Sequence, residues 1–249
     1  MGDMMISEDL KQLWKISLSM TSTWGSEKDF EIMEKFKPFW KKVNQGKLKI
    51  TSEILHGVPE SSSSFFTKQQ NSRVKTFLQK VFYISDEDSF RKCLTYFFNG
   101  TNIKKSFEDK RNLIIAFPPK ERSSYINSFS QQHEEYGKLS IINQYCTALP
   151  SAGIMAYDIS NCVSICRLGL CQGYLKESEL AAYLDPLALM AQENYSSFEE
   201  FGLSSIVGLL YSMDKVDEKA YNYCMDKLKM ALTHPQSYWN NIDWKLNLS

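Results

Sequence analysis

The sequence is poor in glycine and proline, with only 11 Gly and 7 Pro among 249 residues. Architectures with many β-turns need more of both, so this scarcity disfavours a turn-dense β fold and favours long helices. The sequence also lacks a run of 18 apolar residues, which a membrane-spanning helix would need. Its least charged stretch, residues 139–175, is interrupted by polar side chains. We expect this stretch to be a buried part of the core.

The sequence has no excess of either charge, because 29 Lys and Arg balance 29 Asp and Glu. Proteins that bind nucleic acid over much of their surface usually carry a basic excess. We therefore do not expect such a function, although a local basic patch stays open. Since 43% of the residues are hydrophobic, the chain can bury a large core. We predict one helical domain over residues 1–249.

No targeting signal is visible at the start of the sequence. A basic segment followed by an apolar stretch is missing. Gly2 would suit myristoylation, but Ile6 stands where that motif requires Ser or Thr. We predict a soluble cytoplasmic protein, with export by a route lacking a classical signal left open. The cysteines are expected to be reduced and to pack as small apolar groups; they are Cys93, Cys146, Cys162, Cys166, Cys171 and Cys224.

The apolar pattern of the first 150 residues predicts helix after helix. Apolar side chains recur at helical spacing over residues 6–23 and 30–43, and Pro38 is expected to kink or restart the second helix. Ser85 to Asp88 resemble a capping box, with Ser85 as the N-cap. Residues 113–117 could form a short strand, and a helix is predicted from Pro119 to about Leu149. The low-complexity stretch 59–64 predicts a surface loop.

The last hundred residues give the clearest pattern. Residues 154–170 carry apolar side chains on most sides, which predicts a central helix that begins near Ser151. Gly173 can close that helix in a left-handed conformation. Ser197 to Glu200 form a full capping box. A last helix is predicted from about residue 216 to 232. The fold class is therefore mostly α: a compact, irregular multi-helix domain with at most a minor β element near 113–117.

Asp158 and Arg167 are the only charged residues between Lys138 and Lys176. Burying a charge is costly unless it is paired, so each should have a partner or reach solvent. Nine residues place the two side chains on opposite faces of a helix, so we do not expect them to pair with each other. Two interpretations stay open: each side chain ties the helix to a neighbouring element, or one or both line a pocket.

Several short motifs resemble the core of a bacterial family known as domain of unknown function 1266. The resemblance is best over residues 150–245 and implies a fold class, since the family has no established activity. Tyr157 and Phe198 stand where the family has Trp, Tyr238 where it has Pro, and Asn161 near a frequent Arg. The motifs are Ala156-Tyr157-Asp158, Arg167-Leu168-Gly169, Gly173-Tyr174-Leu175, residues 195–201, the tail 235–244 and Trp24-Gly25.

Known catalytic and metal-binding motifs are missing. The three histidines (His56, His133 and His234) are scattered, and no C-x-x-C pair accompanies them. The sequence from His133 to Tyr136 lacks the second histidine of a metalloprotease helix, because position 137 is Gly. Gly169 and Gly173 follow no phosphate-loop pattern, and we expect them to serve helix packing and capping. The sequence predicts neither a metal nor a cofactor.

Lysines cluster around three aromatic residues in the N-terminal part. This pattern suits a basic patch for nucleic acid or an acidic partner. It also suits the solvent-exposed face of an amphipathic helix whose aromatic side chains belong to the core, which is the interpretation we favour. The cluster consists of Lys35, Lys37, Lys41 and Lys42, with Lys47 and Lys49 beyond, interleaved with Phe36, Phe39 and Trp40.

The absence of a recognisable nucleophile, metal or phosphate signature favours a non-catalytic protein-interaction or regulatory module. Its expected partner is a protein. The alternative is an enzyme, or a secreted effector or toxin-associated protein, with an unfamiliar site on the central helix that carries Asp158 and Arg167.

Overall fold

The computed structural model describes residues 8–57 and 65–248, with side chains given outside 65–70. The loop predicted at 59–64 and the helix start at Ile6 lie outside this part of the chain. Within it, all regular structure is helical and no strand occurs, which confirms the mostly α fold class. Up to residue 145 the helices are α1 (Glu8–Ser17), η1 (Leu18–Thr21), α2 (Glu27–Lys35), α3 (Phe39–Asn44), α4 (Ser52–His56), α5 (Phe65–Phe82), α6 (Glu87–Phe98), α7 (Asn102–Ala116), α8 (Pro119–Asn127) and α9 (Glu134–Tyr145).

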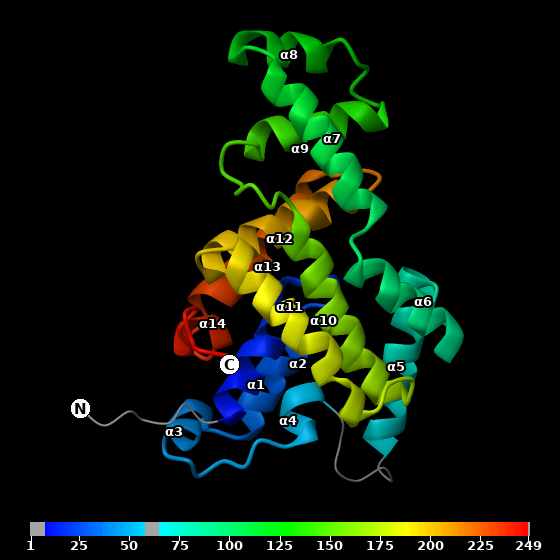
Figure 1. Cartoon of the computed structure of the whole chain (residues 1–249). Helices are drawn as coiled ribbons and strands as arrows, with labels where there is room; N and C mark the ends of the chain where they lie inside the picture. Colours follow the sequence, from blue (N-terminus) through cyan, green and yellow to red (C-terminus); the bar gives the residue numbers. More distant parts are fainter. Residues whose placement is uncertain (1–7, 58–64, 249) are drawn as a thin grey trace, which may run out of the picture.

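Helix α10 (Met155–Gln172) runs through the middle of the molecule and contacts helices from both halves of the chain (Figure 1). Every residue from Ala156 to Gly169 is buried, as the all-round apolar pattern predicts. Around and after it lie η2 (Glu177–Glu179), α11 (Ala181–Asn194), α12 (Phe198–Ser212), α13 (Glu218–Thr233) and α14 (Tyr238–Asn241).

Two glycines shape the end of α10. Gly173 adopts a φ of +74° and ends the helix, and the amide of Tyr174 donates to the carbonyl of Gly169 at 2.9 Å. This is the glycine cap that the sequence predicts. A Cβ at Gly169 would lie 2.4 Å from the ring of Phe90, so only glycine lets α6 approach α10 this closely. The predicted packing and capping roles are thereby confirmed.

An aromatic cluster joins α1 and α12 to the C-terminal tail. Trp239 and Trp244 are buried, and both contact the ring of Phe198. The indole of Trp239 donates to the carbonyl of Ser17 at 3.1 Å, and that of Trp244 to the carbonyl of Tyr195 at 3.1 Å. The tail therefore closes this side of the core.

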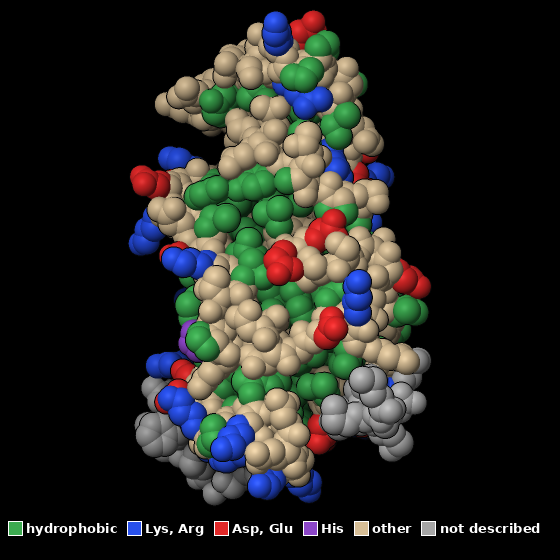
Figure 2. All heavy atoms as spheres, turned by 90° about the vertical axis from the view of Figure 1, so that its left-hand side faces the viewer, with side chains coloured by type: hydrophobic (Ala, Val, Ile, Leu, Met, Phe, Trp, Pro, Cys, Tyr) green, Lys and Arg blue, Asp and Glu red, His purple; other side chains and the backbone are tan. Residues whose placement is uncertain are grey.

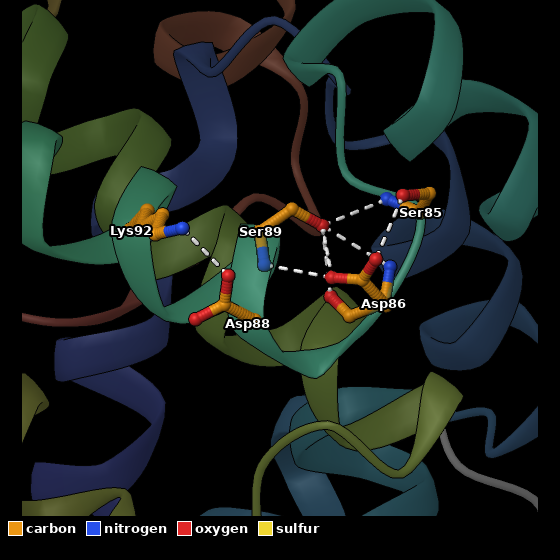
Figure 3. Close-up of polar contacts among 5 residues, drawn as sticks. All are labelled: Ser85, Asp86, Asp88, Ser89 and Lys92. Atoms are coloured by element: carbon orange, nitrogen blue, oxygen red, sulfur yellow. Dashed lines mark hydrogen bonds and ion pairs between the residues drawn. The ribbon is translucent and has the colours of Figure 1, made fainter.

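The start of α6 differs from the sequence prediction. Its N-cap is Asp86 rather than Ser85: the Asp86 carboxylate accepts the Ser89 amide, and the Ser89 hydroxyl accepts the Asp86 amide (Figure 3). Ser can thus replace Glu in a capping box when its hydroxyl reaches back to the N-cap amide. Lys92 also forms an ion pair with Asp88 on the same exposed turn.

Two further predictions about the middle of the chain are wrong. The possible strand at 113–117 belongs mainly to α7, where Ile114 is buried while Leu113 and Ile115 are exposed. One buried position in three suits a helix that packs on one side only. The helix predicted from Pro119 to Leu149 is broken into α8 and α9, and His133 caps α9 by accepting the Glu135 amide.

Helices α7, α8 and α9 form one end of the molecule, and α3 and α4 lie at the other (Figure 1). The predicted start of α10 near Ser151 is also shifted, because Ile154 is the residue that precedes its first turn. Pro38 separates α2 from α3, so the second predicted helix restarts there. None of the helices in the described ranges combines the length and apolar content needed to cross a bilayer.

Candidate functional site

Asp158, in the first turn of α10, is buried and ties this helix to the start of α7. Its carboxylate accepts the backbone amide of Thr101 at 2.9 Å and the Thr101 hydroxyl at 2.8 Å. The same hydroxyl oxygen accepts the Lys104 amide and so caps α7. Burial raises the pKa of Asp158 to about 6, against the hydrogen bonds of Thr101 and the charge of Lys104, which lower it. The geometry gives Asp158 a connecting role.

Arg167, near the other end of α10, ties three segments of the N-terminal part together. Its guanidinium binds both carboxylate oxygens of Asp29 in α2, with Nη1 3.2 Å from Oδ2. Nη1 also donates to the hydroxyl of Ser19 at 2.8 Å, and Nε donates to the carbonyl of Leu55 at 3.0 Å. Burial disfavours the charged form, but the Asp29 carboxylate outweighs it and keeps the Arg167 pKa above its ordinary value. Asp158 and Arg167 therefore have separate partners, as their spacing predicts.

Arg167 also lines a pocket of about 470 Å³, which we call the Arg167 pocket. The pocket lies between α10 and the elements α2, α4 and α5, and its volume falls in the range of small-molecule sites. For Arg167 the two interpretations of the sequence thus coexist: the side chain connects helices and faces a pocket. The lining residues are Trp24, Gly25, Glu27, Lys28, Asp29, Glu31, His56, Arg73, Val74, Ser164, Arg167, Leu168 and Cys171.

His56, the last residue of α4, is only 6% exposed and lines this pocket. Its Nδ1 is buried and has no hydrogen-bond partner among the described residues. Burial, and then the positive charge of Arg167, lower the pKa of His56 to about 3. The imidazole is therefore neutral at physiological pH and offers one donor and one acceptor.

The cysteine in the pocket is not activated. The Cys171 thiol donates to the carbonyl of His56 at 3.3 Å, and burial raises its pKa to about 11. A thiol of this kind stays protonated near neutral pH and is a poor nucleophile. All six cysteines are free thiols. Within the described ranges, no group of three or more His, Cys, Asp or Glu side chains is arranged to hold a metal ion.

The lysines of the predicted basic patch lie on α2, α3 and the turn between them, and α3 is at the lower end of the molecule (Figure 1). Lys35 forms an ion pair with Glu53 at 2.6 Å, and Lys37 pairs with Glu34. Lys42 donates to backbone carbonyls, and Lys41 is exposed. Two of the four lysines are thus neutralised locally. The interleaved aromatic residues Phe36, Phe39 and Trp40 pack against the core.

A second cavity, of about 680 Å³, lies between α9 and the segment 213–218. All of its charged lining residues are exposed or half-buried, so water can solvate them and none needs a protein or ligand partner. Its lining includes Tyr145 and Tyr221, whose hydroxyls are 2.8 Å apart. On the face turned to the viewer in Figure 2, hydrophobic side chains gather below the protruding upper end. The Arg167 pocket is the stronger candidate because buried polar groups surround it.

Comparison with known families matches residues 78–244 to the model described as a protein of unknown function, DUF1266. The chain belongs to the DUF1266 family. No curated protein and no solved structure matched the chain. The matched region includes Asp158, Arg167 and the aromatic residues Phe198, Trp239 and Trp244. The family resemblance inferred from the sequence motifs is thereby confirmed.

The DUF1266 match covers most of the helical core but leaves out nine of the thirteen residues that line the Arg167 pocket. Asp29, His56 and Arg73 all precede residue 78. Sequence reasoning missed these three residues, because nothing in their local pattern marks them. Asp29 is one of two acidic residues in the first turn of α2, and such residues are common in the first turn of a helix. His56 and Arg73 belong to no recognisable sequence motif. A search for a partner of the isolated Arg167 could have pointed to an acidic residue, but could not have chosen among 29.

The motif Trp24-Gly25, which resembles the DUF1266 opening motif, lies on the wall of the same pocket. Gly25 has a φ of +91°, and a Cβ there would lie 2.5 Å from the Glu27 carboxylate. Trp24 packs edge-on against Phe77 of α5 with ring centroids 4.5 Å apart. Asn161, near the position of a frequent family arginine, accepts the amide of Thr23 at 3.0 Å and holds this segment on α10.

Proposed function

We propose that this protein is a non-catalytic regulatory module that binds a small molecule in the Arg167 pocket and acts through a protein partner. The observation that carries the proposal is that Arg167, 9% exposed and held by Asp29, lines a pocket of about 470 Å³. Helices α2, α4 and α10 all supply groups to this network. A ligand in the pocket would therefore contact the residues that hold three helices together, which is a way to bias their packing.

The chemistry of the pocket supports binding rather than catalysis. His56, with a pKa of about 3, is a weak base and is not a proton donor near neutral pH. Cys171, with a pKa of about 11, is a thiol rather than a thiolate. Asp29 is committed to Arg167. An enzyme acting in this pocket would need a base or nucleophile that these groups do not supply.

The bacterial and cytoplasmic assignments belong to the same proposal. The motifs shared with the DUF1266 family support a bacterial origin. Six free thiols support a reducing compartment such as the cytoplasm. The exposed apolar side chains Leu113 and Ile115 on α7 support contact with a protein partner at that end of the molecule.

Equilibrium dialysis of the purified protein against a bacterial metabolite extract, followed by mass spectrometry, tests the function. We expect a compound that is retained by the wild type and less by Lys28→Trp, which places a large ring at the pocket wall. Lys92→Trp, on the exposed side of α6, is the matched control and should retain the compound. The compound should be recovered with its mass unchanged after long incubation. Conversion to a product would favour the enzyme instead.

A further inference from the structure

The first turn of α2 presents unpaired hydrogen-bond donors at the Arg167 pocket. Glu27, Lys28 and Asp29 begin this nine-residue helix and line the pocket. The side chain of the N-cap residue, Ser26, makes no capping hydrogen bond. The backbone amides of Glu27 and Lys28 donate to no acceptor within the described part of the chain. Free amides and the helix dipole make such a terminus attractive to an anion.

Arg167 adds an independent and buried donor to the same pocket. A guanidinium carries five N–H groups. Four of them are used: one by Leu55, one by Ser19 and two by Asp29. The remaining N–H, on Nη2, has no acceptor among the residues that the structure describes. Because the side chain is only 10% exposed, water has little access to replace that acceptor. A ligand oxygen would satisfy this donor.

Arg73 supplies a cation to the pocket from another helix. It lies on α5, is exposed and lines the pocket. Its guanidinium makes no ion pair or hydrogen bond within the described ranges, which makes it the pocket's uncommitted cation. Lys75, two residues further along α5, is also exposed but does not line the pocket. The two side chains therefore differ in access to the pocket on the same helix.

The carboxylates of the pocket do not cancel these donors. Asp29 is paired with Arg167, and Glu31 lies 3.3 Å from the ammonium of Lys28. Glu27 is exposed and forms no ion pair among the described residues, but its charge attracts the ammonium of the buried Lys227, which also lies beside Gly25. Its carboxylate lies against Gly25. It is the one negative charge that a bound anion would have to repel or displace.

We infer that the Arg167 pocket binds a small organic anion whose carboxylate or phosphate group sits between the first turn of α2, Arg167 and Arg73. Its apolar part lies against Trp24 and Leu168, which line the same pocket. The inference rests on the proposed function and names the ligand class. A volume of about 470 Å³ accommodates an anion attached to one or two rings.

Titration calorimetry with four probes of similar size tests the inference: phenyl phosphate, benzoate, benzyl alcohol and benzylamine. We expect the two anions to bind and the neutral and cationic probes to bind at least tenfold more weakly. Tighter binding of phenyl phosphate would assign a phosphate ligand, and tighter binding of benzoate a carboxylate. Affinity for the anions should fall as the salt concentration rises.

Three exposed positions give matched variants. Arg73→Gln should weaken anion binding about tenfold, since it removes a charge-assisted contact. Glu27→Gln should tighten it about threefold by removing the competing charge. Lys75→Gln, which removes an equal charge from the same helix, should leave the affinity unchanged. Circular dichroism and the melting temperature of each variant check that the fold is kept.

The outcomes separate this inference from the proposed function. Binding of benzyl alcohol or benzylamine in place of the anions would overturn the anion assignment and leave a ligand pocket. Equal anion affinity in the wild type and Arg73→Gln would place the anion elsewhere and also overturn the inference. Failure of all four probes to bind at 10 mM, roughly the weakest affinity expected of such small ligands, would count against both proposals.

Discussion

The carboxylate of Asp29 and the guanidinium of Arg167, 138 positions apart in the sequence, form a two-pronged ion pair that joins α2 to the central helix. The two side chains are 2% and 10% exposed, so the pair lies almost entirely out of water. Replacing one partner of such a pair by a neutral residue leaves an uncompensated buried charge, which lowers the stability of the folded state.

Asp29→Asn keeps the shape of the side chain but removes its charge. We expect it to lower the free energy of unfolding by about 3 kcal/mol, and Arg167→Gln to do the same. The double variant should lose less than the sum, because neither charge is left alone. Urea unfolding followed by circular dichroism measures this. Lys92→Gln, which breaks a fully exposed pair, should leave the free energy of unfolding nearly unchanged. Additive losses at positions 29 and 167 would contradict the coupling.

His56 should make the protein sensitive to mild acid. Its pKa in the folded state, about 3, is below the ordinary value of 6.5, so the unfolded chain binds the proton first. The contribution of neutral His56 to the stability of the folded state is complete above pH 6.5 and is lost as the pH falls toward 3. Between pH 7 and pH 5, His56 should account for a loss of about 2 kcal/mol.

His56→Gln, which stays neutral, should remove that loss. The measurement is the free energy of unfolding in urea at pH 7, 6 and 5 for both proteins. The difference between wild type and variant cancels the contribution of the other titrating groups. Parallel pH profiles of wild type and variant would show that the pKa of His56 is the same in the folded and unfolded states.

Asp158 should act in the opposite direction over the same range. Burial raises its pKa to about 6 in the folded state, above the ordinary 3.8, so the folded protein binds the proton first. This contribution favours the folded state as the pH falls below 6 and disappears as the pH rises through 6. From pH 7 to pH 5 it should add about 1 kcal/mol.

Asp158→Asn should remove the gain, because Asn does not titrate. Relative to this variant, the wild type should therefore become more stable by about 1 kcal/mol on going from pH 7 to pH 5. The urea series used for His56 serves here too. A wild type that loses stability relative to Asp158→Asn over this interval would mean that the Thr101 hydrogen bonds outweigh burial.

Gly169→Ala tests the close contact between α6 and α10. The added Cβ would lie 2.4 Å from the Phe90 ring, which must then shift within a packed core. We expect a cost of about 1 to 3 kcal/mol. Gly137, inside α9, has no atom within 4 Å of its Cβ position, and alanine there should be neutral or stabilising by up to about 1 kcal/mol. Thermal unfolding compares the two; equal melting temperatures would rule out the close packing.

Much of the helical fold could be predicted from the sequence, because its signals are local. The apolar pattern of α10 and the cap at Gly173 need only a few consecutive residues. Local signals failed where two candidates compete within one turn, as at Ser85 and Asp86, or where an apolar run suits both strand and helix, as at 113–117. At α6 the Ser89 hydroxyl decided the start by accepting the Asp86 amide, and at 113–117 the burial of Ile114 on one side of α7 accompanies the helix.

The sequence by itself determined that α10 is buried and that its two charges, Asp158 and Arg167, must each find a partner. Only the tertiary structure decided which partners these are. Thr101 and Asp29 come from segments 57 and 138 residues away, and no pairing rule in the sequence selects them. The Arg167 pocket has the same origin: its walls come from four helices, and a cavity exists only once those helices are packed.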